Sequence, residues 1–479
     1  MPSNYKENLG FRHTLPILEL KFFIGSTKLV ITGVLMRLSL MTLTPIKITA
    51  LMLGISVIAA FLVNLLYMKR YFLVLVLLVT SFSVNAVGQA PIKDLKPTVI
   101  LVSLDGFRYD YLDKYAPPTL QKLAKEGVRA KWMIPSFPTK TFPNHYTVAT
   151  GLYPAHHGIV ENNIWDFGVI FSMGKREEVQ NGRWWLGEPI WVTAEKQGQR
   201  AGAFFFPGTE AVIGGKRPTF WNNYDGAIPN DKRVDTILGW LDLPQAERPT
   251  VYTLYFSDTD DAGHRYSPES EENKAAVAKV DGDLKRLVDG LNARKIGKKV
   301  NIIVVSDHGM ATVDQRNAVV LDDYFDFADT DRILWTGEIV QIFPKAGKEI
   351  EILAALKKPG IHTTCWAKSD IPERLHYSDG PRVAPIVCSS DLGWMMTSRD
   401  RYERTKKQSD FLGPRGAHGY DNKYQEMQAT FIAHGKAFKK HKVVEPFSNV
   451  EVYNIMCKIL GLKPAPNDGD LNHVKNMLK

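Results

Sequence analysis

Three apolar runs constrain the fold of this chain more than any other feature of its sequence. They cover Thr98–Ser103, Pro249–Phe256 and Lys299–Ser306, and each is rich in β-branched or aromatic residues. Runs of this kind are typical of strands that are buried on both faces of a parallel sheet. Each is followed within a few residues by aspartate, so we expect a site at the carboxyl ends of these strands.

Helical patterns separate these runs, which predicts an α/β fold with a mainly parallel central sheet flanked by helices. We expect one domain over residues 91–479, with an irregular insertion at about 320–415, where Pro and Gly are frequent and long periods are missing. The other expected elements are helices at Leu112–Gly127, Pro268–Asn292 and Asn449–Leu460, the last capped by Ser448 and ended by Gly461, and strands at Arg200–Phe206 and Ala429–Ala433.

Residues 1–90 form a separate hydrophobic region. Ile48–Tyr67 is about twenty apolar or small residues without a charge, which is long enough to span a bilayer. The following segment starts with Met68-Lys-Arg, continues with an apolar stretch and ends in small residues, the three-part pattern of a signal peptide. We expect Met68 to be the true start, with cleavage after Ala86 or Ala90. A membrane anchor at Ile48–Tyr67 is the alternative, and both export the rest of the chain.

The formal charge of +9 is concentrated near the N-terminus. Residues 1–86 contain eight Lys or Arg and two Glu, so they carry +6 and the rest of the chain carries only +3. A nearly neutral folded part lacks the strong positive field of a polyanion-binding protein. We therefore expect no specific nucleic-acid partner.

The three cysteines do not form a Cys-x-x-Cys motif. A zinc site would therefore have to use histidine and carboxylate ligands. Cys365 and Cys388 could pair in an exported protein, although their spacing leaves this open. Cys457 lies in a helical pattern and is expected to be a small buried side chain.

Aspartate and histidine recur in four short motifs. Taken singly, each has an ordinary structural interpretation, such as a turn or cap residue, a solvated acidic loop or a structural histidine. Their conjunction favours nitrogen and oxygen ligands for two zinc-class ions. Asp260 and His264 are expected in a loop that turns both side chains to one ion. The candidate metal ligands are Asp105, Asp260, His264, Asp307, His308 and His418.

Thr141 is the candidate nucleophile. It lies just ahead of an expected helix, with Pro143 in the first turn. A threonine in this place could simply cap the helix. However, helix N-terminal amides attract phosphate, and a metal ion on the hydroxyl oxygen would make an alkoxide at neutral pH. Asn162 is a possible donor to a phosphate oxygen or a turn residue, while Lys140 and His145 receive no role from their spacing.

The ordered motifs resemble those of the ectonucleotide pyrophosphatase/phosphodiesterases, a family of the alkaline phosphatase superfamily. The resemblance extends from about residue 97 to residue 470. It rests on Leu104-Asp-Gly-Phe-Arg108, Thr141-Phe-Pro-Asn-His-Tyr146, Gly151-Leu-Tyr-Pro-Ala-His-His-Gly-Ile-Val160, Gly187-Glu-Pro-Ile-Trp-Val-Thr193, Asp260 with Gly263-His264, Asp307-His-Gly-Met310 and His418-Gly-Tyr-Asp-Asn422.

The resemblance implies two zinc ions and a role for each motif. One ion would be held by Asp260, His264 and His418, and the other by Asp105, Asp307, His308 and the Thr141 oxygen. Thr141 would attack phosphorus and form a covalent intermediate between the two ions. Asn162 would contact a non-bridging oxygen, and Phe142 and Tyr224 would stack on the two faces of a nucleobase.

The chain departs from the family pattern in one motif of the expected substrate pocket. The family often has Trp-Pro-Gly-Ser-Asp/Glu, whereas this chain has Phe206-Pro-Gly-Thr-Glu210. We expect Phe206, Glu210 and Tyr255 to contribute to the pocket. The chain also lacks the Cys-rich and nuclease-like modules of the larger animal members, which points to a minimal, bacterial-type enzyme.

The implied activity is that of a secreted or periplasmic zinc phosphodiesterase acting on nucleotide diesters and pyrophosphates, for example converting a nucleoside triphosphate to the monophosphate and pyrophosphate. The alternatives are a superfamily enzyme for a phosphomonoester or a choline or lipid phosphodiester, and a zinc-containing binding protein without turnover. A monoesterase would be expected to use Arg to balance the extra phosphate charge, so neutral Asn162 favours a diester. The intact Thr141 and ligand set argue against a binding protein.

Overall fold

A computed structural model describes residues 68, 90–408 and 413–479 of the chain. The chain divides into two units, residues 1–87 and residues 88–479, and the second unit holds nearly all described residues. The expected anchor at Ile48–Tyr67 and the cleavage position at Ala86 lie outside the described residues. Among the residues that are described, no helix has the length and apolar character needed to cross a membrane.

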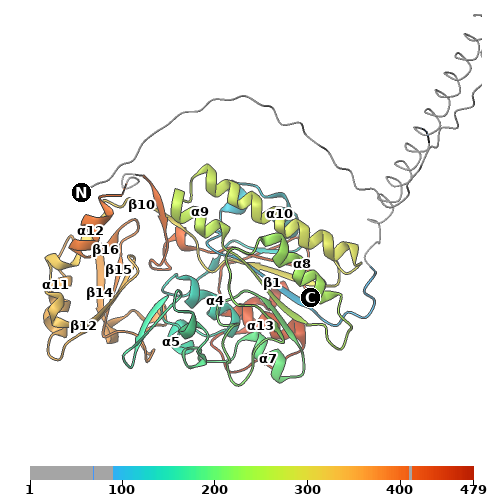
Figure 1. Ribbon diagram of the computed structural model, residues 1–479, viewed down its shortest axis with the longest axis horizontal. Helices are drawn as coiled ribbons and strands as arrows, with labels where there is room; N and C mark the ends of the chain where they lie inside the picture. Colours follow the sequence, from blue (N-terminus) through green and yellow to red (C-terminus); the bar gives the residue numbers. More distant parts are fainter. Residues whose placement is uncertain (1–67, 69–89, 409–412) are drawn as a thin grey trace, which may run out of the picture. The chain divides into compact units, whose positions relative to one another are not determined.

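The core of the second unit is an eight-stranded sheet (Figure 1), and it is mainly parallel, as the sequence predicts. Its strand order is β19-β2-β18-β9-β1-β8-β6-β7. The pairings are parallel except for those of β18, which runs antiparallel to both β9 and β2. The strands are β1 Val99–Leu104, β2 Val128–Ala130, β6 Ala201–Phe204, β7 Phe220–Trp221, β8 Val251–Phe256, β9 Asn301–Val305, β18 Phe431–His434 and β19 Lys442–Val444.

Both faces of the sheet are buried, which explains why its strands read as unbroken apolar runs. In β1, Val99 and Leu101 belong to one hydrophobic cluster, whereas Ile100, Val102 and Leu104 belong to another. Residues of α4, α7 and α13 share the first cluster, and residues of α3, α8 and α10 share the second. Figure 1 shows these two helical layers on opposite sides of the sheet.

The helices that the sequence indicates are present, with three differences, and further helices lie between them. The bounds are α2 Tyr111–Lys114, α3 Pro118–Glu126, α4 Thr141–Thr150, α5 Pro154–His157, α6 Arg176–Val179, α7 Ile190–Lys196, α8 Asn230–Leu241, α9 Asp258–Tyr266, α10 Glu271–Ala293, α11 Glu349–Leu356, α12 Arg399–Thr405, α13 Glu451–Leu460 and α14 Leu471–Val474.

The single helix expected at Leu112–Gly127 is two helices, α2 and α3. Pro117 lies between them and Pro118 is the first residue of α3, because proline disfavours helical geometry in the residue before it and its missing amide donor is tolerated at the start of a helix. The second difference is at the start of α13: the expected N-cap, Ser448, lies in strand β20, and the helix begins at Glu451. The predicted end of α13 at Gly461, which is in the left-handed region, is confirmed. The third difference, α9, belongs to the site and is described below.

The insertion contains more regular structure than its sequence pattern indicates. Four antiparallel strands form a sheet of order β12-β13-β15-β14, and α11 packs against β14. Short strands had no periodicity long enough to be recognised from the sequence. The strands are β12 Thr330–Trp335, β13 Ile339–Pro344, β14 Thr363–Ala367 and β15 Ile386–Ser390, and the insertion has a hydrophobic core of its own.

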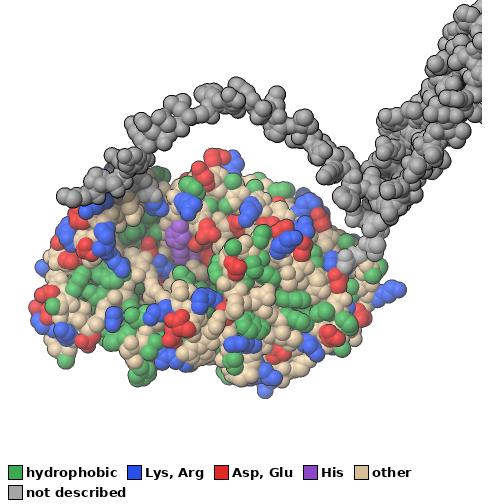
Figure 2. Space-filling model, in the orientation of Figure 1, with side chains coloured by type: hydrophobic (Ala, Val, Ile, Leu, Met, Phe, Trp, Pro, Cys, Tyr) green, Lys and Arg blue, Asp and Glu red, His purple; other side chains and the backbone are tan. Residues whose placement is uncertain are grey.

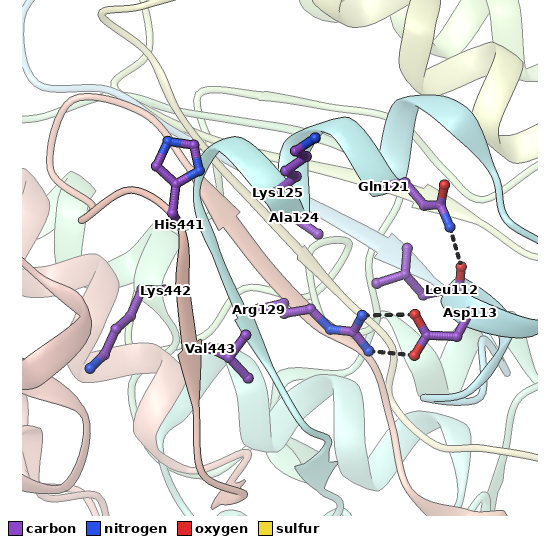
Figure 3. Close-up of a pocket in the computed structure, with 9 residues that line it drawn as sticks. All are labelled: Leu112, Asp113, Gln121, Ala124, Lys125, Arg129, His441, Lys442 and Val443. Atoms are coloured by element: carbon purple, nitrogen blue, oxygen red, sulfur yellow. Dashed lines mark hydrogen bonds and ion pairs between the residues drawn. The ribbon is translucent and has the colours of Figure 1, made fainter.

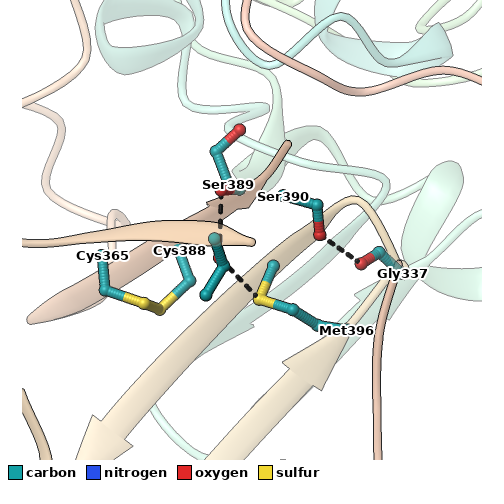
Figure 4. The surroundings of a disulfide bond; sticks show 7 residues. Gly337, Cys365, Cys388, Ser389, Ser390 and Met396 are labelled. Carbon is teal, nitrogen blue, oxygen red and sulfur yellow. Dashed lines mark hydrogen bonds between the residues drawn. A yellow bond between two sulfur atoms is a disulfide. The ribbon is translucent and has the colours of Figure 1, made fainter. Parts of the chain in front are cut away.

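A disulfide between Cys365 and Cys388 resolves the pairing that the sequence left open (Figure 4). The two residues lie directly opposite each other on β14 and β15. Cys457 is buried and free, as expected. The smaller strand pairs are β3 Met133–Ile134 with β20 Phe447–Ser448, β4 Asn163–Asp166 with β5 Val169–Ser172, β10 Ala311–Val313 with β17 Arg415–Ala417, and β11 Ala318–Val320 with β16 Met395–Thr397.

Buried His157 ties α5 to α4 in its neutral form. The Ile159 amide donates to Nδ1, so the ring proton is on Nε2, close to the Pro143 carbonyl and the Thr147 hydroxyl. Burial lowers the pKa of His157 from 6.5 to about 3. The unfolded chain therefore takes up a proton between these values while the folded chain does not, and stability is lost as pH falls.

We expect this loss to disappear in a His157→Gln variant, which keeps polar atoms but does not titrate. Between pH 6.5 and pH 4, the free energy of unfolding of the wild type should fall relative to the variant by up to about 1.4 kcal/mol per pH unit. Urea denaturation at a series of pH values measures this difference. The same substitution at exposed His441 is the control, and parallel curves for wild type and His157→Gln would contradict the assignment.

Candidate active site

The carboxyl ends of three adjacent strands bring the first acidic residues together. β1 lies between β8 and β9, and the paired residues Leu104 with Phe256 and Ser103 with Val305 show that the strands end at the same level. Asp105 follows β1 and Asp307 follows β9. Because β18 runs antiparallel to β9, the chain entering β18 also arrives at this edge, and it carries His418.

A tight turn at Gly106 lets Asp105 and Asp260 approach. Gly106 has a φ of +66°, and a Cβ atom there would lie 3.0 Å from the Asp260 backbone. A side chain would therefore meet both backbone strain and contact with the neighbouring segment. The Gly106 amide donates to Asp307 Oδ1 over 3.2 Å, which ties the ends of β1 and β9.

Asp260 and His264 lie on helix α9, and the loop expected here is wrong. Their four-residue spacing places both side chains on one face of the helix, 3.4 Å apart between Asp260 Oδ1 and His264 Nε2. The helix packs closely on β17: a Cβ on Gly416 would lie 2.3 Å from the Gly263 carbonyl oxygen. This approach brings His418 Nε2 to 3.6 Å from the same Asp260 oxygen.

Backbone carbonyls orient the three candidate histidine ligands. The Nδ1 atoms of His264, His308 and His418 lie 2.9, 2.8 and 2.8 Å from the carbonyl oxygens of Gly416, Gly309 and Thr139, respectively. A carbonyl only accepts, so each Nδ1 carries a proton, and in its neutral form each ring presents a lone pair on Nε2. This is the usual arrangement of metal-binding histidines.

The lone pairs of these rings face carboxylate oxygens. His308 Nε2 lies 3.4 Å from Asp105 Oδ1 and 3.0 Å from Asp307 Oδ2. Asp105 Oδ1, Asp260 Oδ1 and Asp307 Oδ2 are buried and accept no hydrogen bond. Electron pairs facing each other in a buried site repel, and a cation between them would remove the repulsion. The residues therefore fit metal ions chemically.

The residues that could hold metal ions form overlapping groups. Asp260, His264 and His418, the set that the family resemblance implies for one ion, are close enough together to share one. The second predicted set is divided between a group of Asp105, Asp260 and His308 and a group of Asp105, His145 and Asp307. The His308 and His418 rings stack with centroids 3.5 Å apart, so the two regions adjoin.

The concentration of carboxylates changes their acidity in opposite directions. Burial, together with the charges of Asp307 and Asp260, raises the pKa of Asp105 well above its ordinary value. Burial also disfavours the charge on Asp307, but the positive charges that His308 and His145 carry in their protonated forms outweigh it and hold that pKa well below its ordinary value. One carboxylate is thus compensated by imidazoles, whereas the other lies among like charges.

Thr141 is the first residue of α4, beside the acidic cluster. Its Oγ1 lies 3.3 Å from His308 Nε2. The Phe142 amide, at the same helix terminus, donates to Asn162 Oδ1 over 2.9 Å. Because a backbone N–H can only donate, Asn162 must turn its oxygen to the helix, which leaves its NH₂ group to donate elsewhere.

A pocket extends from Thr141 and Asp105 toward a mainly aromatic region. Phe142 and Tyr224, the predicted nucleobase contacts, both line it. Phe142 packs on Phe171 and Trp185, which leaves it partly exposed, and 42% of the Tyr224 surface is accessible. The other lining residues are Asp105, Thr141, Met173, Arg176, Val179, Phe205, Phe206, Pro207, Gly208, Glu210, Tyr255, Ser257, Asp260 and Asp261.

The other predicted pocket residues have additional partners. The Tyr255 hydroxyl donates to Asp105 Oδ2 over 2.6 Å, so it supports a candidate metal ligand as well as lining the pocket. Phe206 packs edge-on against His145. Glu210 is buried and accepts hydrogen bonds from Arg176, Gln180 and the Tyr224 amide.

Two residues without a sequence-derived role are part of the site. His145, one helical turn after Thr141, lies 2.9 Å from the Thr141 carbonyl through Nδ1, and the same atom is 3.2 Å from Asp307 Oδ2. Its four-residue spacing from Thr141 could have indicated this contact. Buried Lys140 bonds to the His418 carbonyl, which sequence spacing could not indicate.

Another depression lies away from this cluster, over β2 and the edge strand β19 (Figure 3). Arg129 in this depression forms a two-point ion pair with Asp113. None of the clustered aspartate and histidine residues lines it. Figure 2, by contrast, shows histidine side chains reaching the surface in a hollow of the visible face.

Comparison with known proteins supports the family suggested by the motifs. The sequence profile of type I phosphodiesterase/nucleotide pyrophosphatase matches residues 99–421. Venom phosphodiesterase CdcPDE of Crotalus durissus collilineatus is 39% identical over 404 residues, and ectonucleotide pyrophosphatase/phosphodiesterase family member 3 of Rattus norvegicus is 38% identical over 397 residues. These alignments cover 82% and 80% of this chain and 47% and 44% of the relatives, so the chain spans about half the length of these curated relatives.

Solved structures give the same result. Murine ectonucleotide pyrophosphatase/phosphodiesterase 5 aligns with a TM-score of 0.74 and 34% identity, covering 80% of this chain and all of that chain. An inactive threonine-to-alanine variant of the murine protein, solved with AMP, aligns with a TM-score of 0.73 and 33% identity over 80% of this chain and all of that chain. The chain therefore belongs to the ectonucleotide pyrophosphatase/phosphodiesterase family of the alkaline phosphatase superfamily.

Proposed function

We propose that this protein is a two-zinc nucleotide pyrophosphatase/phosphodiesterase that acts through a covalent threonine intermediate. The observation that carries the proposal is the Thr141 hydroxyl at a helix N-terminus, 3.3 Å from His308 in a cluster of unpaired carboxylate oxygens. The aromatic pocket beside it supports a nucleotide as substrate. Asp260, His264 and His418 would hold one zinc ion, and Asp105, Asp307, His308 and the Thr141 oxygen would hold the other.

Bound zinc would lower the pKa of the Thr141 hydroxyl and neutralise charge on the phosphoryl group. Thr141 then loses its proton to solvent and attacks phosphorus. A bond forms between Oγ1 and phosphorus, while the bond from phosphorus to the leaving-group oxygen breaks. Water hydrolyses the Thr141 ester in a second step and releases the nucleoside monophosphate. The Asn162 NH₂ group would donate to a non-bridging oxygen in both steps.

A phosphodiester suits this donor set better than a monoester. A bound diester carries one negative charge on its non-bridging oxygens, whereas a monoester dianion carries two. The neutral amide of Asn162 matches the smaller charge. Phe142 and Tyr224 on the walls of the pocket would stack on a nucleobase, which tolerates different bases. The solved complex of a murine family member with AMP supports this choice of substrate class.

We also propose that the enzyme works outside the cytoplasm, as a secreted or periplasmic protein. The Cys365–Cys388 disulfide supports an oxidising compartment. The signal-like segment after Met68 supports export. Relatives that include venom phosphodiesterases are consistent with an extracellular enzyme.

Zinc should stabilise the metal-free protein. At a free zinc concentration about 100 times the dissociation constant, the free energy of unfolding should rise by about 2.7 kcal/mol per site. Differential scanning calorimetry of chelator-treated protein, with and without zinc, measures the rise. Asp260→Asn should reduce it, whereas Asp331→Asn, at an exposed position, should not. An unfolding temperature indifferent to zinc would refute the metal site.

Replacing the nucleophile should separate catalysis from binding. Thr141→Ala should lower turnover of a nucleotide diester by at least about 10⁴-fold, because the covalent step is lost. The variant should still be stabilised by zinc through the remaining ligands. Thr312→Ala, at an exposed position, serves as the control. Retained turnover in Thr141→Ala would exclude the threonine intermediate.

Substrate choice should follow the aromatic pocket. With zinc, we expect kcat/KM to be highest for p-nitrophenyl thymidine monophosphate, compared with p-nitrophenyl phosphate and p-nitrophenyl phosphorylcholine. Phe142→Ala should lower the nucleotide value by about 10-fold, since one stacked base contributes about 1–3 kcal/mol. Phe167→Ala is the control, because that ring is 93% exposed and does not line the pocket. Preference for the monoester or the choline ester would assign the enzyme to another substrate class.

A further inference from the structure

The turn between β12 and β13 reaches the catalytic side chains from the insertion. We define this turn, Thr336–Glu338, as the hairpin tip. Thr336 is half-buried and Glu338 is buried, although both lie between strands of the insertion sheet. Their polar atoms bond to residues next to Thr141 and Asn162 in the sequence, so the tip touches the neighbours of two proposed catalytic residues.

Lys140 is the first contact. Its side chain is 6% exposed, and its ammonium donates to Glu338 Oε2 over 2.5 Å and to the His418 carbonyl over 2.7 Å. The Thr336 carbonyl is its third acceptor, at 3.4 Å. All three N–H groups are thereby directed, and one ammonium joins the residue before Thr141, the backbone of His418 and the hairpin tip.

Glu161 is the second contact. The Thr336 hydroxyl lies 2.9 Å from Glu161 Oε1, with the Ile339 carbonyl as an alternative acceptor at 3.0 Å. The other Glu161 carboxylate oxygen accepts from the Asn163 amide over 3.1 Å. Glu161 is buried, and Asn162 lies between the two residues of this bond. The hairpin tip therefore also braces the backbone that carries Asn162.

The tip itself is held by the insertion sheet. The Ser390 amide on β15 donates to the Glu338 carbonyl over 2.9 Å, and the Met396 amide donates to the Gly337 carbonyl over 2.7 Å. Figure 4 shows Ser390 and Gly337 near the disulfide, which lies on the same strand, β15, through Cys388. A side chain on such a support has little freedom to move.

We propose that the hairpin tip is a positioning element of the active site: Glu338 acts through Lys140 on Thr141 and His418, and Thr336 acts through Glu161 on Asn162. This inference rests on the proposed function, because it assigns positions to the nucleophile, a metal ligand and a phosphate donor. The hairpin tip of the insertion then helps to position the active site.

The positioning role differs from simple stabilisation. A buried ion pair often contributes little net stability, because both charges lose their hydration. Here the Lys140 ammonium also donates to the carbonyl of His418, a proposed metal ligand. The residue before Lys140 in the sequence is Thr139, whose carbonyl orients the His418 ring. Moving Lys140 would therefore shift His418 and Thr141 together. Supporting contacts of this kind commonly change metal affinity or activity by about 10–100-fold.

The test uses Glu338→Gln, Lys140→Met, their double variant and Thr336→Val in the full chain. Glu338→Gln and Lys140→Met should each lower kcat for p-nitrophenyl thymidine monophosphate by about 10–100-fold, with KM nearly unchanged. Zinc affinity, measured by competition with a chromogenic chelator, should fall in both. The double variant should lose no more than the worse single variant, because the pair acts as one unit.

Thr336→Val should separate the two contacts. It removes the hydroxyl at the Glu161 contact, so kcat should fall while zinc affinity stays at the wild-type value. Glu351→Gln and Thr364→Val are matched controls at exposed positions of the same insertion, and both should behave as the wild type. Circular dichroism and the unfolding temperature show that each variant is folded, and the double variant removes the charge that either single variant leaves unpaired.

Two results would overturn the inference. One is unchanged kcat and zinc affinity in Glu338→Gln and Lys140→Met while the wild type is active. The other is a double variant in which the kcat losses of the two single variants multiply, which would indicate that Glu338 and Lys140 act independently. A wild type that does not hydrolyse the nucleotide ester would instead refute the proposed function, and zinc affinity would still test the contact between Lys140 and His418.

Discussion

Buried carboxylate oxygens that face unprotonated imidazole nitrogens are the constraint on which this structure depends. Asp105, Asp260 and Asp307 each bring an oxygen without a hydrogen bond into the same region, and the candidate histidines present lone pairs to it. Such a meeting is unfavourable in a low dielectric unless a cation is present. The tight turn at Gly106 and the close packing of α9 serve to bring these groups together.

Sheet topology explains how distant parts of the sequence converge. The parallel strands β1, β8 and β9 deliver aspartates at their carboxyl ends, which is the ordinary place for a site in an α/β fold. His418 cannot come from the end of a parallel strand, because it precedes antiparallel β18. The insertion lies between Asp307 and His418 in the chain, so both of its ends are near this edge. Its hairpin tip contacts Lys140 there.

Sequence reasoning predicted the parallel sheet because its strands are buried on both faces and lack polar alternation. It placed Asp105 and Asp307 at strand ends for the same reason. It missed helix α9, since Gly263 and the acidic residues suggested a loop, although the four-residue spacing fits one helical face. The Lys140–Glu338 pair was beyond prediction: these residues are 198 positions apart, and their contact depends on a hairpin that the sequence pattern did not indicate.

The geometry of Lys140 sets it apart from the surface lysines of the insertion. Lys348 pairs with Asp329 and Glu351, but its side chain is 37% exposed, and water can replace either partner. Lys140 is 6% exposed, and its three acceptors come from two other segments, the hairpin tip and the chain at His418. Removing one acceptor would leave part of a buried ammonium unsatisfied, so these two segments and the one that carries Lys140 must keep their relative positions. A buried charge can therefore specify geometry even where its net contribution to stability is small.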